Sequence, residues 1–235
     1  MNLLIIKNTK TEGPGLLSTV LREREIGSDM VEYYQDGILP PLSRYSAVIV
    51  LGGPQSANDT TEKMKDLIAY TRRILREDIP YFGICLGMQV LARAAGGRIG
   101  RCPVKEIGWR DATGEYYRMH LTERGRRDPL LAGIRGPVRL FQLHEEMAEP
   151  SVCGEVLAFG DDCPVQLIKE GRYAYGIQGH IEVDEPLLKI IGKTDPGILP
   201  KARSSLIPDY QAIRDEYIGT GMTLFSNFLD IIGEI

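Results

Sequence analysis

The first half of the chain alternates short apolar runs with amphipathic segments. Residues 3–6 and 45–51 are almost continuously apolar, which is typical of strands buried on both faces of a sheet. Residues 16–24 and 62–76 place apolar side chains at helical spacing, and a further strand is expected at residues 30–34. Strands that alternate with helices predict a parallel sheet joined by right-handed crossovers.

After Gly97 the pattern changes to shorter strand-like pieces, some of which are expected to pair antiparallel. The expected fold class is therefore α/β, with a central, mostly parallel and partly mixed sheet flanked by helices in a flavodoxin-like three-layer sandwich. Residues 1–235 are expected to form one domain with a helical C-terminal extension from about 184 to 235. The strand-like pieces are residues 115–121, 138–143, 155–159, 164–168 and 173–178, and the late helices are residues 184–191, 209–217 and 222–232, with a loop at 194–205.

Residues 79–92 are the stretch around which the rest of the chain is organised, because an apolar run there leads into a helical segment. Cys85 stands between Gly83 and Gly87 at this switch, which is the arrangement of a nucleophile elbow. Side chains at the two glycine positions would collide with the adjoining strand and helix. A helix N-terminus also favours a thiolate. Cys85 is therefore predicted to be a catalytic nucleophile, the alternative being a small buried hydrophobe.

A thiol nucleophile needs a base, and the base needs an orienting group. His180 and Glu182 are two positions apart, so in an extended backbone their side chains point to the same side. We expect His180 to take the proton of Cys85 and Glu182 to orient the imidazole. The alternative is a surface histidine near a surface glutamate at the end of a strand.

The segment Gly52-Gly53-Pro54 closes the apolar run 45–51 and is expected beside the elbow. Two backbone N–H groups that converge on one point form an oxyanion hole. The N–H groups of Gly53 and Leu86 are the candidates. An ordinary strand-ending turn would use the same residue types.

Composition narrows the class of protein. The 235 residues are 43% hydrophobic and 26% charged, which is ordinary for a soluble globular protein. A net charge of −4 gives no electrostatic case for nucleic acid or an anionic membrane surface. The N-terminal apolar run is too short for a signal peptide or a membrane span, so a cytoplasmic protein is expected. The four cysteines form no CxxC pair and there are three histidines, so neither a metal, a cofactor nor a disulfide framework is expected.

These motifs, in this order, resemble the class I, triad-type glutamine amidotransferases, and most closely the glutaminase part of GMP synthase and its stand-alone relatives. Residues 83–89 match the G-x-C-x-G-x-Q elbow of that family. Residues 52–56 match its GGPxS segment, and residues 175–183 resemble its YGxQFHPEV segment. The resemblance covers roughly residues 3–183.

The resemblance implies a reaction and assigns roles to residues. The Cys85 thiolate attacks the γ-amide carbon of glutamine, and the N–H groups of Gly53 and Leu86 stabilise the oxyanion. His180 protonates the departing ammonia, and water then hydrolyses the thioester. Gln89, at the family's position four residues after the nucleophile, would help to hold the substrate.

The sequence departs from the family pattern near the expected substrate. Gly179 and Ile181 replace the usual Phe and Pro, without loss of a catalytic atom. His144 and Glu145 lie in a segment that resembles the family's His-Gly-Asp or His-Gly-Glu, so both are candidate substrate-binding residues. Glu145 stands where glycine is usual, and its charge is expected to repel the α-carboxylate of glutamine. A structural histidine and a solvent-facing glutamate are the alternatives.

Three functions are compatible with these motifs. The first is a glutamine-hydrolysing amidotransferase that hands ammonia to an acceptor or to a separate synthetase subunit, because the chain contains no P-loop. The second is a stand-alone hydrolase of γ-glutamyl compounds, and the third is a non-catalytic regulatory or binding protein on the same fold. The triad residues favour an enzyme, a cysteine-dependent amide hydrolase. Its expected partner is glutamine or a γ-glutamyl compound, and neither nucleic acid nor a membrane is expected.

Overall fold

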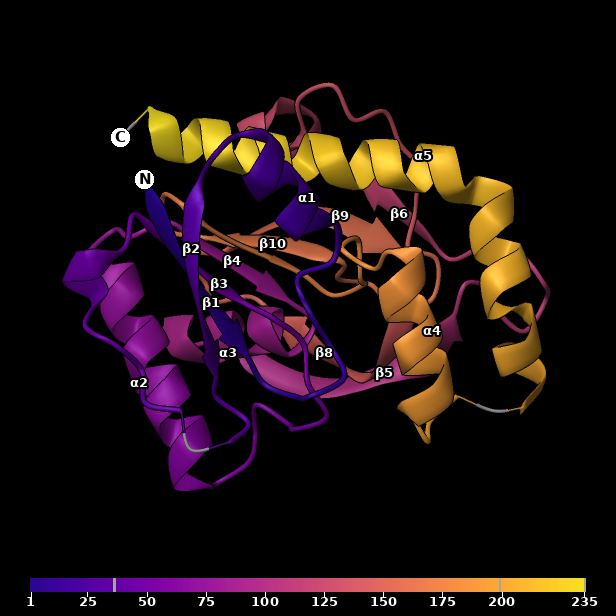
Figure 1. Cartoon of the computed structure of the whole chain (residues 1–235), viewed down its shortest axis with the longest axis horizontal. Coiled ribbons are helices and arrows are strands. Elements are labelled where there is room, and N and C mark those ends of the chain that lie inside the picture. The colour runs from indigo at the N-terminus through magenta and orange to yellow at the C-terminus, as the bar shows by residue number, and fades with distance from the viewer. Residues whose placement is uncertain (36, 199, 235) are drawn as a thin grey trace.

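The structure, a computed structural model, describes residues 1–35, 37–198 and 200–234. Its centre is a nine-stranded sheet in the order β2-β1-β3-β4-β11-β10-β9-β6-β7, and β5 and β8 form a separate two-stranded ribbon (Figure 1). The strands are β1 (Asn2–Lys7), β2 (Gly27–Glu32), β3 (Ala47–Val50), β4 (Tyr81–Ile84), β5 (Arg98–Gly108), β6 (Arg118–Leu121), β7 (Val138–Arg139), β8 (Gln142–Glu149), β9 (Glu155–Gly160), β10 (Leu167–Glu170) and β11 (Ala174–Ile177). The helices are α1 (Leu16–Glu23), α2 (Glu62–Arg76), α3 (Leu86–Ala95), α4 (Glu185–Thr194) and α5 (Pro200–Gly233), with short 3-10 turns at Leu42–Arg44, Gly125–Arg127 and Pro129–Leu131.

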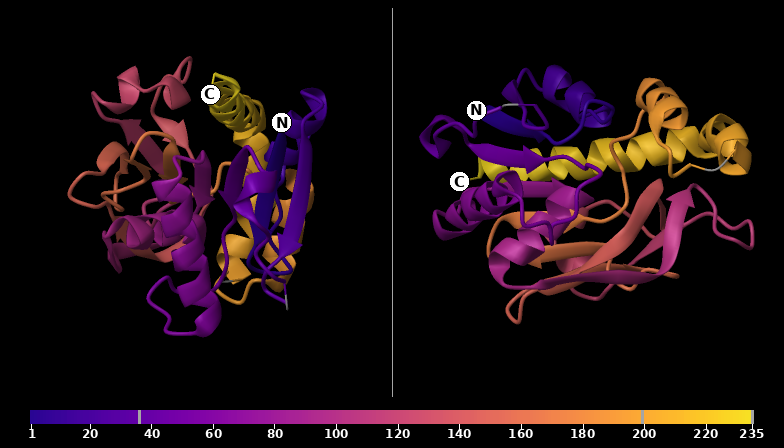
Figure 2. Two further views of the ribbon diagram at one scale, coloured as in Figure 1. Left: turned by 90° about the vertical axis from the view of Figure 1, so that its left-hand side faces the viewer. Right: turned by 90° about the horizontal axis from the view of Figure 1, so that it is seen from below.

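Strand direction changes across the sheet. β1 pairs in parallel with β2 and β3, and β4 pairs in parallel with β3 and β11. Beyond β11 the pairs are antiparallel. Figure 2 shows helices on both sides of the sheet. The predicted α/β fold, a mixed sheet flanked by helices, is therefore confirmed.

The two apolar cores follow from the side-chain alternation of the strands. Leu3 and Ile5 of β1 pack into one core, and Leu4 and Ile6 pack into the other. Alternate side chains of a strand point to opposite faces, so a continuously apolar run serves both layers.

The C-terminal region differs from the sequence prediction. Two helices at 209–217 and 222–232 are predicted, with a loop at 194–205, but the structure has a single helix from Pro200 to Gly233. Leu199, which falls in the predicted loop, lies outside the described residues. Pro208 lies inside α5, where proline lacks an N–H and crowds the preceding turn, and this favours a bend rather than a break. Figure 1 shows α5 changing direction in its first half.

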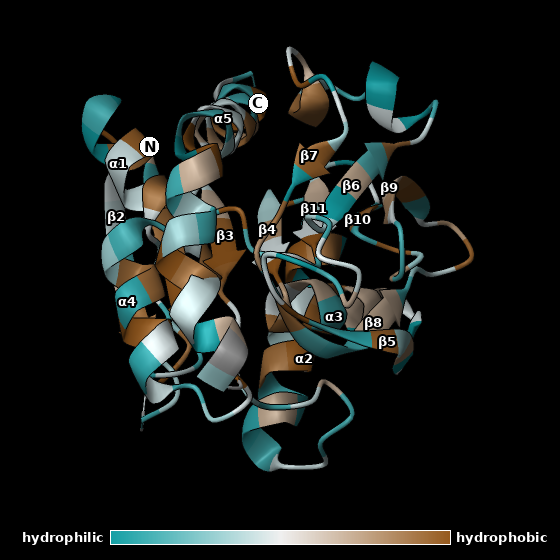
Figure 3. Ribbon diagram, turned by 90° about the vertical axis from the view of Figure 1, so that its right-hand side faces the viewer, coloured by the Kyte–Doolittle hydropathy of each residue, from teal (hydrophilic) through white to brown (hydrophobic). Residues whose placement is uncertain are grey.

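Helix α5 packs directly on the strand that leads to the elbow. The rings of Phe225 and Phe228 lie 5.7 and 5.3 Å from the ring of Phe82 in β4, measured between centroids. Figure 3 shows hydrophobic residues along β3 in the interior, and hydrophilic and hydrophobic residues alternating along the outer helix α4. The C-terminal helix thus contributes to the main core and supports the sheet beneath the predicted nucleophile.

The β5–β8 ribbon is only partly predicted from the sequence pattern. The predicted strand at 138–143 is divided between β7 and the start of β8, and β5 is missed. β5 contains Pro103, which cannot donate to a strand ladder, and its register shifts between Arg101 and Glu106. This interrupted pairing hides the alternation that identifies a strand. In the described part of the chain, no helix has the length and apolar character needed to cross a bilayer.

Candidate active site

Cys85 lies at the sharp turn between β4 and α3. Its backbone has φ 50° and ψ −104°, a conformation that costs of order 1–3 kcal/mol for a residue with a side chain. The turn is tight enough to require glycine on both sides. A Cβ on Gly83 would lie 2.4 Å from the backbone of Gly87, and a Cβ on Gly87 would lie 2.1 Å from the carbonyl oxygen of Val50. The elbow geometry predicted from sequence is therefore present.

Parallel pairing of β4 and β11 places the residues that follow β11 beside Cys85. Ile84 and Ile177 are paired across the two strands, and the N–H of Cys85 donates to the carbonyl of Ile177 at 2.8 Å. His180 and Glu182 follow β11, and His180 Nδ1 lies 2.7 Å from Glu182 Oε1. The structure thus brings together the three residues predicted from sequence to form a triad.

The His180–Glu182 pair is almost completely shielded from water. The two side chains are 1% and 2% exposed. Burial by itself disfavours the charged ring, but the charge of Glu182 and a hydrogen bond with Cys85 outweigh it and raise the pKa of His180 well above its usual value. The protonated form of the imidazole is therefore favoured despite its burial.

Tyr217 of α5 fixes the backbone of the segment that carries the histidine. Its buried hydroxyl donates to the carbonyl of His180 at 3.1 Å and accepts from the N–H of Val183 at 3.1 Å. The backbone of His180 also exchanges two hydrogen bonds with that of Phe141. This contact between distant parts of the chain was not predicted, because no local pattern links Tyr217 to the triad.

Two glutamines lie beside the elbow. Gln89 was predicted from the sequence, and Gln178 was not. Gln178, which is fully buried, has Nε2 3.7 Å from Cys85 Sγ, and its Oε1 is 3.5 Å from Nε2 of Gln89. Gln89 Nε2 is also 3.4 Å from the carbonyl oxygen of Glu146. Gln178 lies between β11 and His180, within the motif that carries His180. This position in the sequence is the signal that could have identified it as a site residue.

The residues predicted to form the oxyanion hole are neighbours. A Cβ on Gly53 would lie 3.2 Å from Cδ2 of Leu86, and Gly53 lines the same cavity as Cys85. β3 and β4 are adjacent parallel strands, so their carboxyl ends lie at one edge of the sheet. The role of the two N–H groups stays a prediction.

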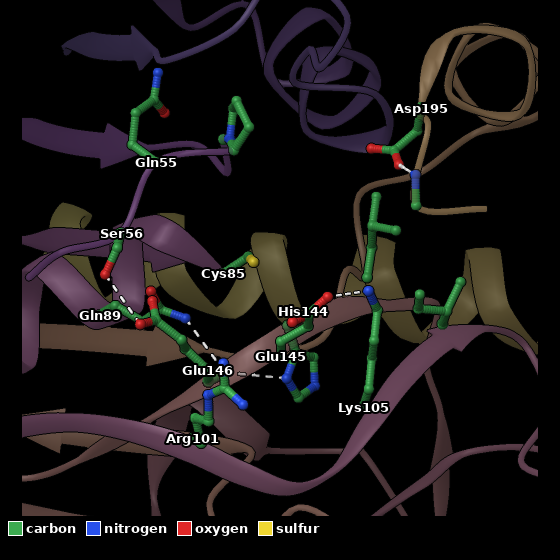
Figure 4. Close-up of a pocket in the computed structure, with 15 residues that line it drawn as sticks. Gln55, Ser56, Cys85, Gln89, Arg101, Lys105, His144, Glu145, Glu146 and Asp195 are labelled. Carbon is green, nitrogen blue, oxygen red and sulfur yellow. Dashed lines mark hydrogen bonds and ion pairs between the residues drawn. The ribbon is translucent and has the colours of Figure 1, made fainter. Parts of the chain in front are cut away.

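A cavity of about 380 Å³ opens over Cys85. Figure 4 shows Gln89, Glu146 and Arg101 on one side of it, and Glu145 and Lys105 on another. Arg101 and Lys105 come from β5, so sequence reasoning, which missed that strand, also missed both. The carboxylate of Glu146 accepts from the hydroxyl of Ser56 at 3.0 Å.

Glu145 lines this cavity, but its charge is offset. It is exposed and forms an ion pair with Lys105. The hydrogen bond from Lys105, with the charges of Lys105 and Arg101, lowers the pKa of Glu145. The repulsion of an α-carboxylate expected from the sequence depends on exposure and on any nearby cation. β5 supplies two such cations, which the sequence pattern did not place here.

His144 lines the same cavity and belongs to a buried polar cluster. Its Nε2 lies 2.8 Å from Oε2 of Glu106, and its Nδ1 lies 3.1 Å from the carbonyl oxygen of Glu146. Cys102, His144 and Cys163 are, among the described residues, the one group whose potential metal-ligand atoms lie within 4.8 Å of one another. Both ring nitrogens of His144 already have partners in the protein, so metal binding would break a buried contact. We therefore assign no cofactor to this cluster.

A cysteine on an elbow, beside a buried histidine–glutamate pair at the carboxyl edge of an α/β sheet, is the arrangement that cysteine-dependent acyl-transfer enzymes use. Residues 15–186 match the family described as glutamine amidotransferase class-I, and the chain belongs to that family.

Known proteins similar to this chain carry related names. The glutamine amidotransferase-like protein YfeJ of Salmonella typhimurium is 30% identical over 155 residues, which are 64% of this chain and 62% of that protein. One subunit of the glutamine-hydrolysing GMP synthase of Ignicoccus hospitalis is 34% identical over 147 residues, 61% of this chain and 70% of that polypeptide. The glutamine-hydrolysing GMP synthase of Thermus thermophilus matches over 25% of its own length. The structure of a glutamine amidotransferase of Thermotoga maritima shares the fold, with a TM-score of 0.86, 24% identity and 97% of each chain covered.

Proposed function

We propose that this protein hydrolyses the side-chain amide of glutamine through a cysteinyl thioester and releases glutamate and ammonia. The observation that carries the proposal is the position of Cys85, on its elbow, against the buried His180–Glu182 pair and open to a cavity of about 380 Å³. The reduced thiol that this chemistry needs favours a cytoplasmic location.

The proposed reaction is a series of proton transfers by His180 coupled to attack by Cys85. His180 takes the thiol proton, and the thiolate of Cys85 attacks the amide carbon while the N–H groups of Gly53 and Leu86 receive the oxyanion. The intermediate collapses as His180 gives its proton to the leaving nitrogen, so that ammonia departs and a thioester remains. Water, deprotonated by His180, then attacks the thioester, and glutamate leaves. Glu182 keeps the imidazole in one tautomer and stabilises its charged form throughout.

The cavity offers complementary charge for the amino-acid end of the substrate. Arg101 forms no ion pair among the described residues and suits an α-carboxylate. The carboxylate of Glu146 suits the α-ammonium group, and Gln89 is placed between Glu146 and the elbow. Because Lys105 offsets the charge of Glu145, free glutamine fits this cavity better than the sequence pattern indicated.

We further propose that the ammonia serves a separate acceptor or synthetase subunit. The support is the likeness to a polypeptide named as one subunit of GMP synthase.

The test is ammonia release from glutamine by the purified protein, beside a panel of γ-glutamyl amides. The wild type and Cys153→Ala, which removes an exposed cysteine that does not line the cavity, should release ammonia at the same rate, and Cys85→Ala should release none. Faster hydrolysis of a γ-glutamyl amide than of glutamine would change the substrate but keep the mechanism. Full activity in Cys85→Ala would refute both the proposed substrate and the proposed cysteine mechanism.

A further inference from the structure

Glu12 is a partly exposed acidic residue beside the triad that the mechanism above does not use, and one oxygen of its carboxyl group is buried. Glu12 lies in the loop between β1 and α1, and that loop is fixed to the triad segment, because the N–H of Leu16 donates to the carbonyl of Glu182 at 2.8 Å.

The carboxyl group of Glu12 occupies space beside the edge of the catalytic imidazole. A Cβ on Gly52 would lie 2.2 Å from Glu12 Oε2 and 3.1 Å from His180 Cε1. The absence of a side chain at position 52 thus leaves room for both groups. Oε2 of Glu12 is inaccessible to solvent and has no hydrogen-bond partner among the described residues, and the same holds for Oε2 of Glu182. Two carboxylate oxygens without such partners therefore lie in the immediate surroundings of one ring.

The charges around Glu12 favour its neutral form. Burial raises the pKa of Glu12 to about 7, and Glu182 and Asp195 add to the rise. His180 and Lys7 act in the opposite direction without cancelling it. The residue also lines a second cavity, of about 230 Å³, that Cys85 shares.

We infer that Glu12 is a positioning residue of the catalytic centre that acts in its protonated form, its neutral carboxyl group supporting the Cε1 edge of His180. A neutral neighbour leaves the imidazolium free to pass its proton to the departing ammonia. An ionised Glu12 would place a second carboxylate beside the ring and hold the proton there. Turnover therefore falls as Glu12 loses its proton. This inference rests on the proposed acid–base role of His180.

The direct test is an NMR titration of the Cε1–H signals of the three histidines in protein labelled with ¹³C-histidine. The Cε1–H signal of His180 should shift with a midpoint near pH 7 in the wild type. Glu12→Gln, which keeps the shape of the side chain but cannot ionise, should abolish that step. Glu12→Asp should keep a smaller step, because its carboxyl group is withdrawn by one methylene. Glu23→Gln, which removes an exposed charge on α1, should leave the step unchanged.

A second experiment measures kcat for ammonia release at several pH values. Wild-type kcat should be roughly tenfold lower at pH 8 than at pH 6, as the protonated fraction falls, and Glu12→Gln should lack that fall. An NMR step that persists in Glu12→Gln, or an identical alkaline fall in the variant, overturns the inference. If the wild type releases no ammonia from glutamine, the proposed function fails, and the NMR titration still decides the contact between Glu12 and His180.

Discussion

Replacement of Glu182 by Gln isolates the charge of the orienting carboxylate. The variant keeps the volume and leaves an amide oxygen able to accept from His180 Nδ1–H. What it removes is a full negative charge from a contact of 2.7 Å between two side chains that are 1% and 2% exposed. The imidazolium, which forms when the thiol gives up its proton, then lacks its buried counter-charge.

The expected loss follows from the size of that attraction. Unit charges about 4 Å apart, at an effective dielectric constant of about 20, attract by roughly 4 kcal/mol. At about 1.4 kcal/mol per tenfold change in rate, this corresponds to nearly three powers of ten. An amide that turns its NH₂ toward Nδ1 would also impose the wrong tautomer, and the corresponding change in a serine-protease triad costs roughly 10⁴-fold. We therefore expect kcat of Glu182→Gln to fall by about 10³ to 10⁴, with KM little changed.

Steady-state ammonia release from glutamine measures this loss. Thermal unfolding of the same samples shows whether the variant is folded. Glu185→Gln is a matched control, because Glu185 pairs with Lys189 on the surface of α4 and lies outside the triad. A folded Glu182→Gln protein whose kcat stays within about tenfold of the wild type would show that Glu182 does not serve the base, and the triad assignment would fail.

Three further predictions concern the surroundings of the triad. Tyr217→Phe removes a hydroxyl that bridges the backbone groups of His180 and Val183, so the free energy of unfolding should drop by about 1–3 kcal/mol in denaturant titrations. An unchanged free energy of unfolding would show that these two hydrogen bonds do not stabilise the segment. Arg101→Ala should raise KM for glutamine by roughly 10-fold to 100-fold with little effect on kcat, and a constant KM would exclude Arg101 from substrate binding. Glu145→Gly should change KM less than about threefold because Lys105 already offsets its charge, whereas a large fall in KM would restore the repulsion expected from sequence.

The elbow and the order of the motifs could be predicted from sequence because they rest on local patterns. The glycines around Cys85 mark a turn that no other residue fits, and the spacing of His180 and Glu182 places both on one side of an extended segment. The parallel sheet then brings the ends of β3 and β4 together, as alternating strands and helices lead one to expect. The parallel pairing of β4 with β11 was not predicted, because β11 follows β10 in an antiparallel pair.

The parts of the site that were missed depend on contacts between distant segments. Arg101 enters the cavity from a strand whose pattern is interrupted by Pro103 and a register shift. Glu106 reaches His144 across that ribbon, and Tyr217 reaches the triad from a helix that continues through a proline. Glu12 lies in a loop with no periodicity. In each case the partner is set by tertiary packing, which single-sequence patterns do not encode.

The central claim is that Cys85 is acylated by the γ-carbonyl of glutamine. A glutamine analogue with an electrophilic chloromethyl ketone in place of the γ-amide tests it, with intact-mass and peptide mass spectrometry as the readout. The account predicts one label per chain, located on Cys85, complete loss of ammonia release in step with labelling, protection by glutamine, and no labelling of Cys85→Ala. Labelling at another residue with loss of activity, or an unlabelled Cys85 in an enzyme that still hydrolyses glutamine, would contradict it.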